Sequence, residues 1–100
     1  IVNGHVDGTG TVEQIARDPR SIRIRVDDGL FRYIVAKGSV AVNGVSLTVG
    51  PDPRGGRFDV FIIPHTWDST NLHALDAGRR VNIEVDIVAK YVERFLGDRG

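Results

Sequence analysis

Residues 39–49 read Ser39-Val40-Ala41-Val42-Asn43-Gly44-Val45-Ser46-Leu47-Thr48-Val49, two alternating apolar runs on either side of an Asn-Gly pair. Alternation of apolar and polar residues with a period of two is typical of a β-strand that buries one face. Asn-Gly is the strongest short signal for a two-residue hairpin turn, because both residues tolerate positive φ. The stretch therefore predicts two antiparallel strands joined at Asn43-Gly44.

The same period of two recurs on both sides of this hairpin. The apolar residues of the further alternating runs are Ile22, Ile24 and Val26; Phe58, Val60 and Ile62; and Val81, Ile83, Val85 and Ile87. A first run, from Val6 to Ile15, is interrupted by glycines, which predicts a bent or bulged strand. Residues 51–56, with Pro and Gly, predict an exposed hairpin loop. Six strands in a chain of 100 residues predict an all-β domain, either a small barrel or a sandwich.

Three helices are predicted between and after the strands. In the first, Asp28 is expected to cap the N-terminus, Leu30 and Ile34 share a face, and Gly38 ends the helix. The second is expected to follow Pro64 and to run near residues 67–72. The spacing of apolar residues over 88–96 changes to that of a helix, which predicts a C-terminal amphipathic helix.

Length and composition indicate one globular domain, residues 1–100. The chain is 41% hydrophobic and 26% charged with a formal net charge of zero, which argues against a nucleic-acid binder. With no cysteine and three scattered histidines, it offers no disulfide and no metal-ligand spacing. No run approaches 18 apolar residues, so we expect a soluble, cytoplasmic protein that does not span a membrane. The strand-like start at Ile1 and the lack of methionine suggest a piece of a longer protein.

Two strands are predicted to carry polar rows on the face opposite the core. If Val45, Leu47 and Val49 point inward, Ser46 and Thr48 point outward together. By the same rule Asn82, Glu84 and Asp86 point outward on the last strand. Composition alone favours the plain interpretation that outward strand positions are simply polar. The alternative is a binding face, because small hydroxyls leave room for a planar ligand and can hydrogen-bond its edge.

The histidines and large aromatic residues are ambiguous from the sequence alone. His5 is suited to move protons near neutral pH, although a structural histidine is the more common case. His65 follows a proline and can either cap the second helix or contact a ligand. Trp67 and Tyr91 are more often packing anchors than stacking platforms.

Four runs of the chain resemble the riboflavin synthase family, in the same order and at the same spacings. They are Asn3–Gly8, Lys37–Val49, Ile62–Thr66, and Val81–Asp86 with Ala89–Arg94. The Gly-Val-Ser-Leu-Thr-Val run is common to both halves of that enzyme. The Gly-His-Val-Asp-Gly opening, the Ile-Pro-His-Thr run and the Ala-Lys-Tyr-Val-Glu-Arg tail are similar to its second half, so the resemblance identifies the chain as a C-terminal lumazine-binding domain.

The resemblance implies a six-stranded Greek-key barrel with short helices and a C-terminal helix, repeated twice in a full chain that assembles as a trimer. It implies a transferase of riboflavin biosynthesis that dismutates two 6,7-dimethyl-8-ribityllumazine molecules to riboflavin and a pyrimidinedione. No metal and no cofactor are implied. Each active site would lie between this barrel and the N-terminal barrel of a neighbouring subunit, which supplies proximity and orientation. The isolated domain is then expected to be inactive or weakly active.

The resemblance also implies the site residues. Ser46, Asp86 and His5 would take part in catalysis, with His5 as a candidate proton carrier. Lys37 would reach the ligand held by the partner barrel, and residues 62–66 would supply backbone contacts. The full set implied to bind the substrate is Gly4, His5, Val6, Lys37, Ser46, Leu47, Thr48, Ile62, Ile63, Pro64, His65 and Thr66.

Two positions depart from the family pattern, and one other function stays open. Trp67 stands where a smaller aliphatic residue is usual, and His73 stands where glycine is common. Trp67 either narrows the ligand site or fills the core. The alternative function is a non-catalytic protein that binds lumazine or flavin. An oligonucleotide-binding barrel fits poorly, because the chain has no excess positive charge and no exposed aromatic row.

Overall fold

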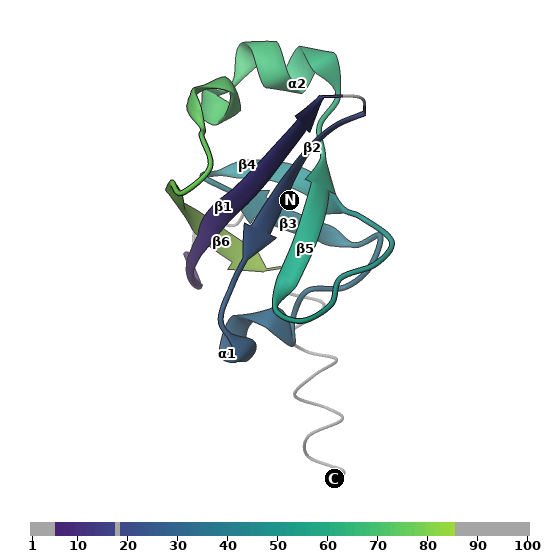
Figure 1. The fold of residues 1–100 in the computed structure, drawn as a ribbon, viewed down its shortest axis with the longest axis vertical. Helices are drawn as coiled ribbons and strands as arrows, with labels where there is room; N and C mark the ends of the chain where they lie inside the picture. Colours follow the sequence, from purple (N-terminus) through teal and green to yellow (C-terminus); the bar gives the residue numbers. More distant parts are fainter. Residues whose placement is uncertain (1–5, 18, 86–100) are drawn as a thin grey trace, which may run out of the picture.

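The computed structural model describes residues 6–17 and 19–85, which form a closed barrel of six antiparallel strands (Figure 1). The strands are β1 Gly8–Arg17, β2 Arg20–Arg25, β3 Ser39–Val42, β4 Val45–Val49, β5 Arg57–Phe61 and β6 Arg80–Val85. Their order around the barrel is β1-β2-β5-β4-β3-β6, and β6 pairs with β1 to close it. The run β6-β3-β4-β5 is a Greek key. The predicted all-β barrel is confirmed, whereas the predicted C-terminal helix lies outside the described residues.

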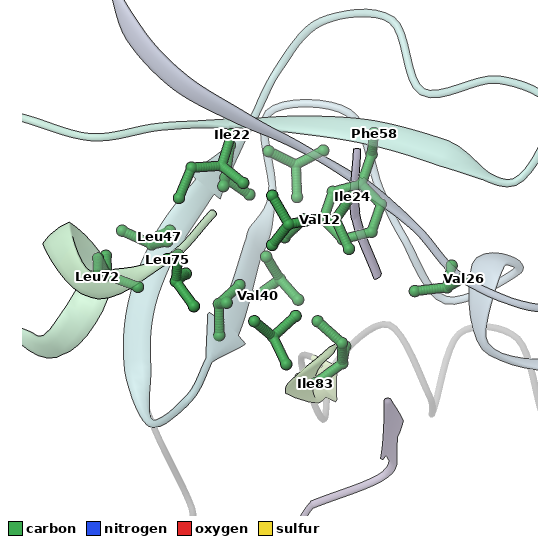
Figure 2. Close-up of a cluster of buried hydrophobic side chains, with 14 of the residues drawn as sticks. Val12, Ile22, Ile24, Val26, Val40, Leu47, Phe58, Leu72, Leu75 and Ile83 are labelled. Carbon is green, nitrogen blue, oxygen red and sulfur yellow. The ribbon is translucent and has the colours of Figure 1, made fainter. Parts of the chain in front are cut away.

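The barrel interior is filled by one apolar side chain from every second strand position (Figure 2). Val12, Ile22, Ile24 and Ile83 are fully buried, and Phe58 is the largest buried side chain. Each such side chain contributes about 1.5–3 kcal/mol relative to an exposed one. The alternation read from the sequence therefore corresponds to the inner and outer faces of the barrel.

The hairpin predicted at Asn43-Gly44 is confirmed and is tied to a third strand. Asn43 and Gly44 have φ of 48° and 84°, as a two-residue hairpin turn requires. The backbone N–H of Asn43 donates to the carbonyl of Asn82 at 2.9 Å, and the Asn43 Oδ1 accepts from the Asn82 N–H at 2.7 Å. The β3–β4 hairpin is thus fastened to β6.

The first strand is bent, as its glycines predict. Its register with β2 shifts between Val12 and Gln14, which marks a β-bulge. At Gly10 an added Cβ would lie 2.7 Å from the Ile24 Cγ2 and 3.0 Å from the Val26 Cγ1. Glycine is needed at this position because β1 passes so close to the side chains of β2.

The two helices predicted between the strands are present with different bounds, and they lie at opposite ends of the barrel (Figure 1). Helix α1, Asp28–Phe31, is a single turn capped by Asp27, whose Oδ1 accepts from the Leu30 N–H at 2.9 Å. The predicted N-cap at Asp28 and end at Gly38 were wrong, because the Asp27 side chain caps the helix one residue earlier and the chain leaves the helix after one turn. At the other end, α2, Pro64–Ser69, is followed by the 3₁₀ helix η1, Asn71–Ala74. Extended backbone at Thr70 divides the helix expected to continue to residue 72.

The outer face of β2 and β5 carries exposed ion pairs. Arg23 donates to Asp59 at 3.0 Å, and Glu13 pairs with both Arg25 and Arg57. The hydrogen bond to Asp59 raises the pKa of Arg23 above its usual range. A raised pKa on a base adds stability that is lost only as the pH rises through that pKa, so this pair makes no pH dependence near neutrality.

Candidate ligand-binding site

The outward face of β4 carries the two hydroxyls predicted to lie there. Ser46 and Thr48 are exposed, whereas Leu47 and Val49 between and beyond them are buried. The predicted orientation of this pair is confirmed. In register, Thr48 lies opposite Phe61 on β5 on one side and Ser39 on β3 on the other.

The polar row predicted on β6 is only partly present. Asn82 is exposed, but Glu84 is only 7% exposed, so its predicted outward exposure was wrong. Its register neighbour Ala41, on the same outer face, is also buried at 5%. Alternation fixes the face to which a side chain points, but it does not reveal whether that face is covered. Asp86 lies outside the described residues.

An open groove of about 800 Å³ lies where β4 and β5 meet α2. It is mostly apolar, with one hydroxyl and a few charges at its rim. Its lining residues are Arg17, Pro19, Arg20, Thr48, Phe61, Ile62, Ile63, Pro64, Trp67 and Asp68. Thr48 and residues 62–64 belong to the predicted site, so two runs distant in the sequence meet in one groove.

Exposed apolar side chains form the floor of this groove. Phe61 is 41% exposed and Ile63 is 66% exposed, although both are large and hydrophobic. Adjacent exposed apolar side chains with a few polar groups are typical of a ligand-binding surface. The ring of a planar ligand could lie against Phe61 while the Thr48 hydroxyl bonds its edge.

The α2 wall of the groove is fixed by backbone and side-chain contacts. The Ile62 N–H donates to the Arg20 carbonyl at 3.1 Å, which joins this segment to the start of β2. Pro64 occupies the first turn of α2, where its missing N–H has no cost. The backbone N–H of Trp67 donates to the Ile63 carbonyl at 3.1 Å. The guanidinium carbon of Arg20 lies 4.1 Å from the centroid of the Trp67 ring.

Comparison with known proteins places this barrel in a family. A family model described as "Lumazine binding domain" matches residues 3–86. The chain belongs to the lumazine-binding domain family. Its relatives include the riboflavin synthases of Actinobacillus pleuropneumoniae, 48% identical over 98 residues, and of Mycobacterium bovis, 46% identical over 107 residues. These alignments cover 96% and 100% of this chain but 45% and 52% of the relatives, so this lumazine-binding domain spans about half their length.

Two solved structures of LumP have the same fold as this lumazine-binding domain. LumP in complex with 6,7-dimethyl-8-(1'-D-ribityl) lumazine is 26% identical with a TM-score of 0.76, over 86% of this chain and 49% of that one. LumP in complex with riboflavin is 25% identical with the same TM-score of 0.76, over 85% and 46%.

The other predicted site residues of the lumazine-binding domain that the structure describes, Ser46 among them, lie outside the groove lining. The Leu47 side chain is in the core, which leaves its backbone to face a ligand. His65 and Thr66 lie on α2, exposed and half-buried respectively. Val6 and Lys37 are exposed at other positions. Gly4, His5 and Asp86 lie outside the described residues.

Five lining residues of the domain were not predicted from the sequence: Arg17, Pro19, Arg20, Phe61 and Asp68. Phe61 had a readable signal, because a large aromatic residue at an outward position breaks the alternation of Phe58 and Val60. Arg17 and Arg20 had none, since arginine is ordinary on an exposed strand. Within residues 6–17 and 19–85 no three His, Asp or Glu side chains are grouped as metal ligands, and no helix there is long and apolar enough to cross a membrane.

Proposed function

We propose that this chain is the C-terminal, substrate-binding barrel of a riboflavin synthase and that it binds 6,7-dimethyl-8-ribityllumazine in the groove. The observation that carries the proposal is the meeting of Thr48 with residues 62–64 in one apolar groove. Identities of 46–48% to riboflavin synthases, and the ligands of the LumP structures, support this choice of ligand.

In this proposal the groove binds the ring and orients it. The ring lies on the apolar floor formed by Phe61 and Ile63, and the Thr48 hydroxyl bonds a heteroatom at its edge. Ile63, the N-cap residue of α2, provides no side-chain cap, so backbone N–H groups of the first turn are left for an external acceptor. Ser46 lies one outward position further along β4 and extends the polar edge.

The complete reaction needs a second ligand held by a second barrel. One lumazine transfers a four-carbon unit to the other, which gives riboflavin and a pyrimidinedione. The N-terminal barrel of a neighbouring subunit in a cytoplasmic trimer would hold the partner molecule, with Lys37 reaching it. Ser46, His5 and Asp86 are the residues proposed for proton transfer, and much of the acidity belongs to the lumazine itself. The proposed reaction uses neither a metal nor a cofactor.

The proposal is tested by fluorescence titration of the chain with lumazine and with riboflavin. Thr48→Val keeps the shape of the side chain but removes the hydroxyl, so we expect about tenfold weaker binding. Thr11→Val is the matched control, because it makes the same change on β1 away from the groove lining. Absence of binding, or equal affinity in Thr48→Val, would contradict the proposed site.

A non-catalytic lumazine or flavin carrier is the second candidate, since both LumP structures hold such ligands. Turnover by the intact two-barrel parent separates the two. Riboflavin formation would establish the enzyme, and tight binding without turnover would establish the carrier.

A further inference from the structure

Two arginines at the groove differ from the exposed arginines elsewhere on the barrel. Most of the others have carboxylate partners: Arg23 pairs with Asp59, Arg25 and Arg57 with Glu13, and Arg54 with Asp52. Within residues 6–17 and 19–85, neither Arg17 nor Arg20 has a side-chain ion pair or hydrogen bond. Both line the groove, so among the described residues each presents there a positive charge without an ion-pair partner.

Arg20 is held in place without a carboxylate. Its guanidinium carbon lies 4.1 Å from the centroid of the Trp67 ring, within the range of a cation–π contact. A guanidinium stacked on a ring keeps its N–H donors at its edge, free for an acceptor. The hydrogen bond from Ile62 to the Arg20 carbonyl fixes the backbone on one side of this pair. The cation is thus fixed on the groove wall beside the segment proposed to hold the ligand.

Among the described residues that line the groove, two are positively charged and one is negatively charged. Arg17 from the end of β1 and Arg20 from the start of β2 are opposed by Asp68 from α2. The lining from β4 and β5 is uncharged, with Thr48 and Phe61. Apolar walls weaken solvent screening, so a fixed guanidinium acts on a ligand ring more strongly there than in open water.

We propose that Arg20, held by Trp67, stabilises the anionic form of the bound lumazine. This inference rests on the proposed function. The anion forms when a C–H bond of the 7-methyl group breaks: the proton passes to water or hydroxide, and the electron pair delocalises into the ring towards its carbonyl oxygens. A cation a few ångströms away favours the charged form of an acid. Trp67 is a positioning residue in this arrangement, because it acts through Arg20.

The test is a pH titration of the chain saturated with 6,7-dimethyl-8-ribityllumazine, followed by the ligand's own absorption. We expect the bound ligand to have an acid dissociation constant about tenfold larger than the free ligand. Arg20→Gln should return this constant close to the free value while neutral lumazine still binds. Asp68→Asn should raise it further, because it removes the negative charge that the described part of the lining carries. Arg79→Gln is the control, because Arg79 is exposed and lies outside the groove lining.

Two further variants separate positioning from folding. Trp67→Phe keeps an aromatic face under the guanidinium and should retain most of the effect, whereas Trp67→Leu should lose it. Equal acidity of bound and free lumazine, or an unchanged constant in Arg20→Gln, would overturn the inference and leave the proposed binding intact. Failure of the parent chain to bind lumazine would instead overturn the proposed function.

Discussion

Among the described residues other than glycine, Asn43 and Lys37 have positive φ, and they do so for different reasons. Asn43 is in the hairpin turn, where asparagine is one of the residues that tolerates this conformation. Its side chain also accepts the 2.7 Å hydrogen bond from Asn82. Asn43→Ala should therefore destabilise the fold by about 1–2 kcal/mol, from strain and from the lost hydrogen bond. Urea unfolding measures the change.

Asn43→Gly is the matched control for that prediction. It keeps the backbone conformation and removes only the side-chain acceptor. If the alanine and glycine variants lost equal stability, the backbone term would be absent and the argument from φ would fail.

Lys37 has φ of 65° although glycine, not lysine, is suited to that region. Its backbone N–H donates to the Val49 carbonyl at 3.1 Å, which ties the strained residue to the end of β4. Lys37→Gly should stabilise the chain by roughly 0.5–1 kcal/mol because it relieves the strain. Lys37→Ala removes the same charge but keeps the strain, so its stability should stay near that of the parent.

The same pair of variants tests the proposed role of Lys37. If the ammonium contacts the ligand of the partner barrel, both variants of the intact two-barrel parent lose turnover, while only the glycine variant gains stability. Full activity in both variants would contradict the proposed contact between Lys37 and the ligand, and the strained backbone at Lys37 would then have no functional explanation.

Single residues also show where alternation was sufficient and where it was not. Ser46 and Thr48 could be placed on the outer face because their neighbours are plainly apolar. Glu84 could not be recognised as buried, since its environment is made by parts of the chain distant in sequence. The contact between Arg20 and Trp67 could not be predicted from the sequence either, because it joins β2 to α2, which are distant along the chain.

At the scale of elements, β1 depends on glycine where it passes close to the side chains that follow on β2. A methyl group at Gly10 would lie 2.7 Å from the Ile24 side chain and 3.1 Å from the Arg25 carbonyl. Gly10→Ala should cost about 1–3 kcal/mol, because β1 must move away from β2 or distort its side chains. The Tm from thermal unfolding measures the loss.

Gly29→Ala is the control for Gly10, since a Cβ there would meet only the Asp27 side chain, at 3.6 Å. A Gly10→Ala variant as stable as Gly29→Ala would show that the contact relaxes without cost.

The helices were predicted in place but not in extent, and the reason is local. Helix α1 ends after one turn although Leu30 and Ile34 have helical spacing: Leu30 is buried in the core from within the helix, and Ile34 packs against the core from the chain beyond it. The sequence after Pro64 reads as one helix, but Thr70 adopts extended backbone and its hydroxyl accepts from the Leu72 N–H at 3.3 Å. A side chain that caps the next turn competes with helix continuation, and apolar spacing does not report that competition.

At the scale of the whole molecule, six alternating runs were enough to predict an all-β domain but not to choose a barrel over a sandwich. The choice depends on the pairing of β1 with β6, whose residues are more than 60 positions apart. The groove instead lies over β1, β2, β5 and β4, which are consecutive neighbours in the strand order, and against α2. The alternation left both a barrel and a sandwich possible, and the resemblance to a known family favoured the barrel.

The architecture of a single barrel also predicts which activities this chain has without a partner barrel. A groove built within one barrel is expected to bind one lumazine without a partner. At a free lumazine concentration of 100 times Kd the bound state gains about 2.7 kcal/mol. For a domain of this size that raises Tm by roughly 10 °C or more.

The same sample should form no riboflavin, because the second substrate has no barrel to hold it, whereas the intact two-barrel parent should form it. Riboflavin formation by the chain alone would mean that two copies of this barrel can face each other and complete a site, and sedimentation at the assay concentration would then have to show a dimer or larger assembly.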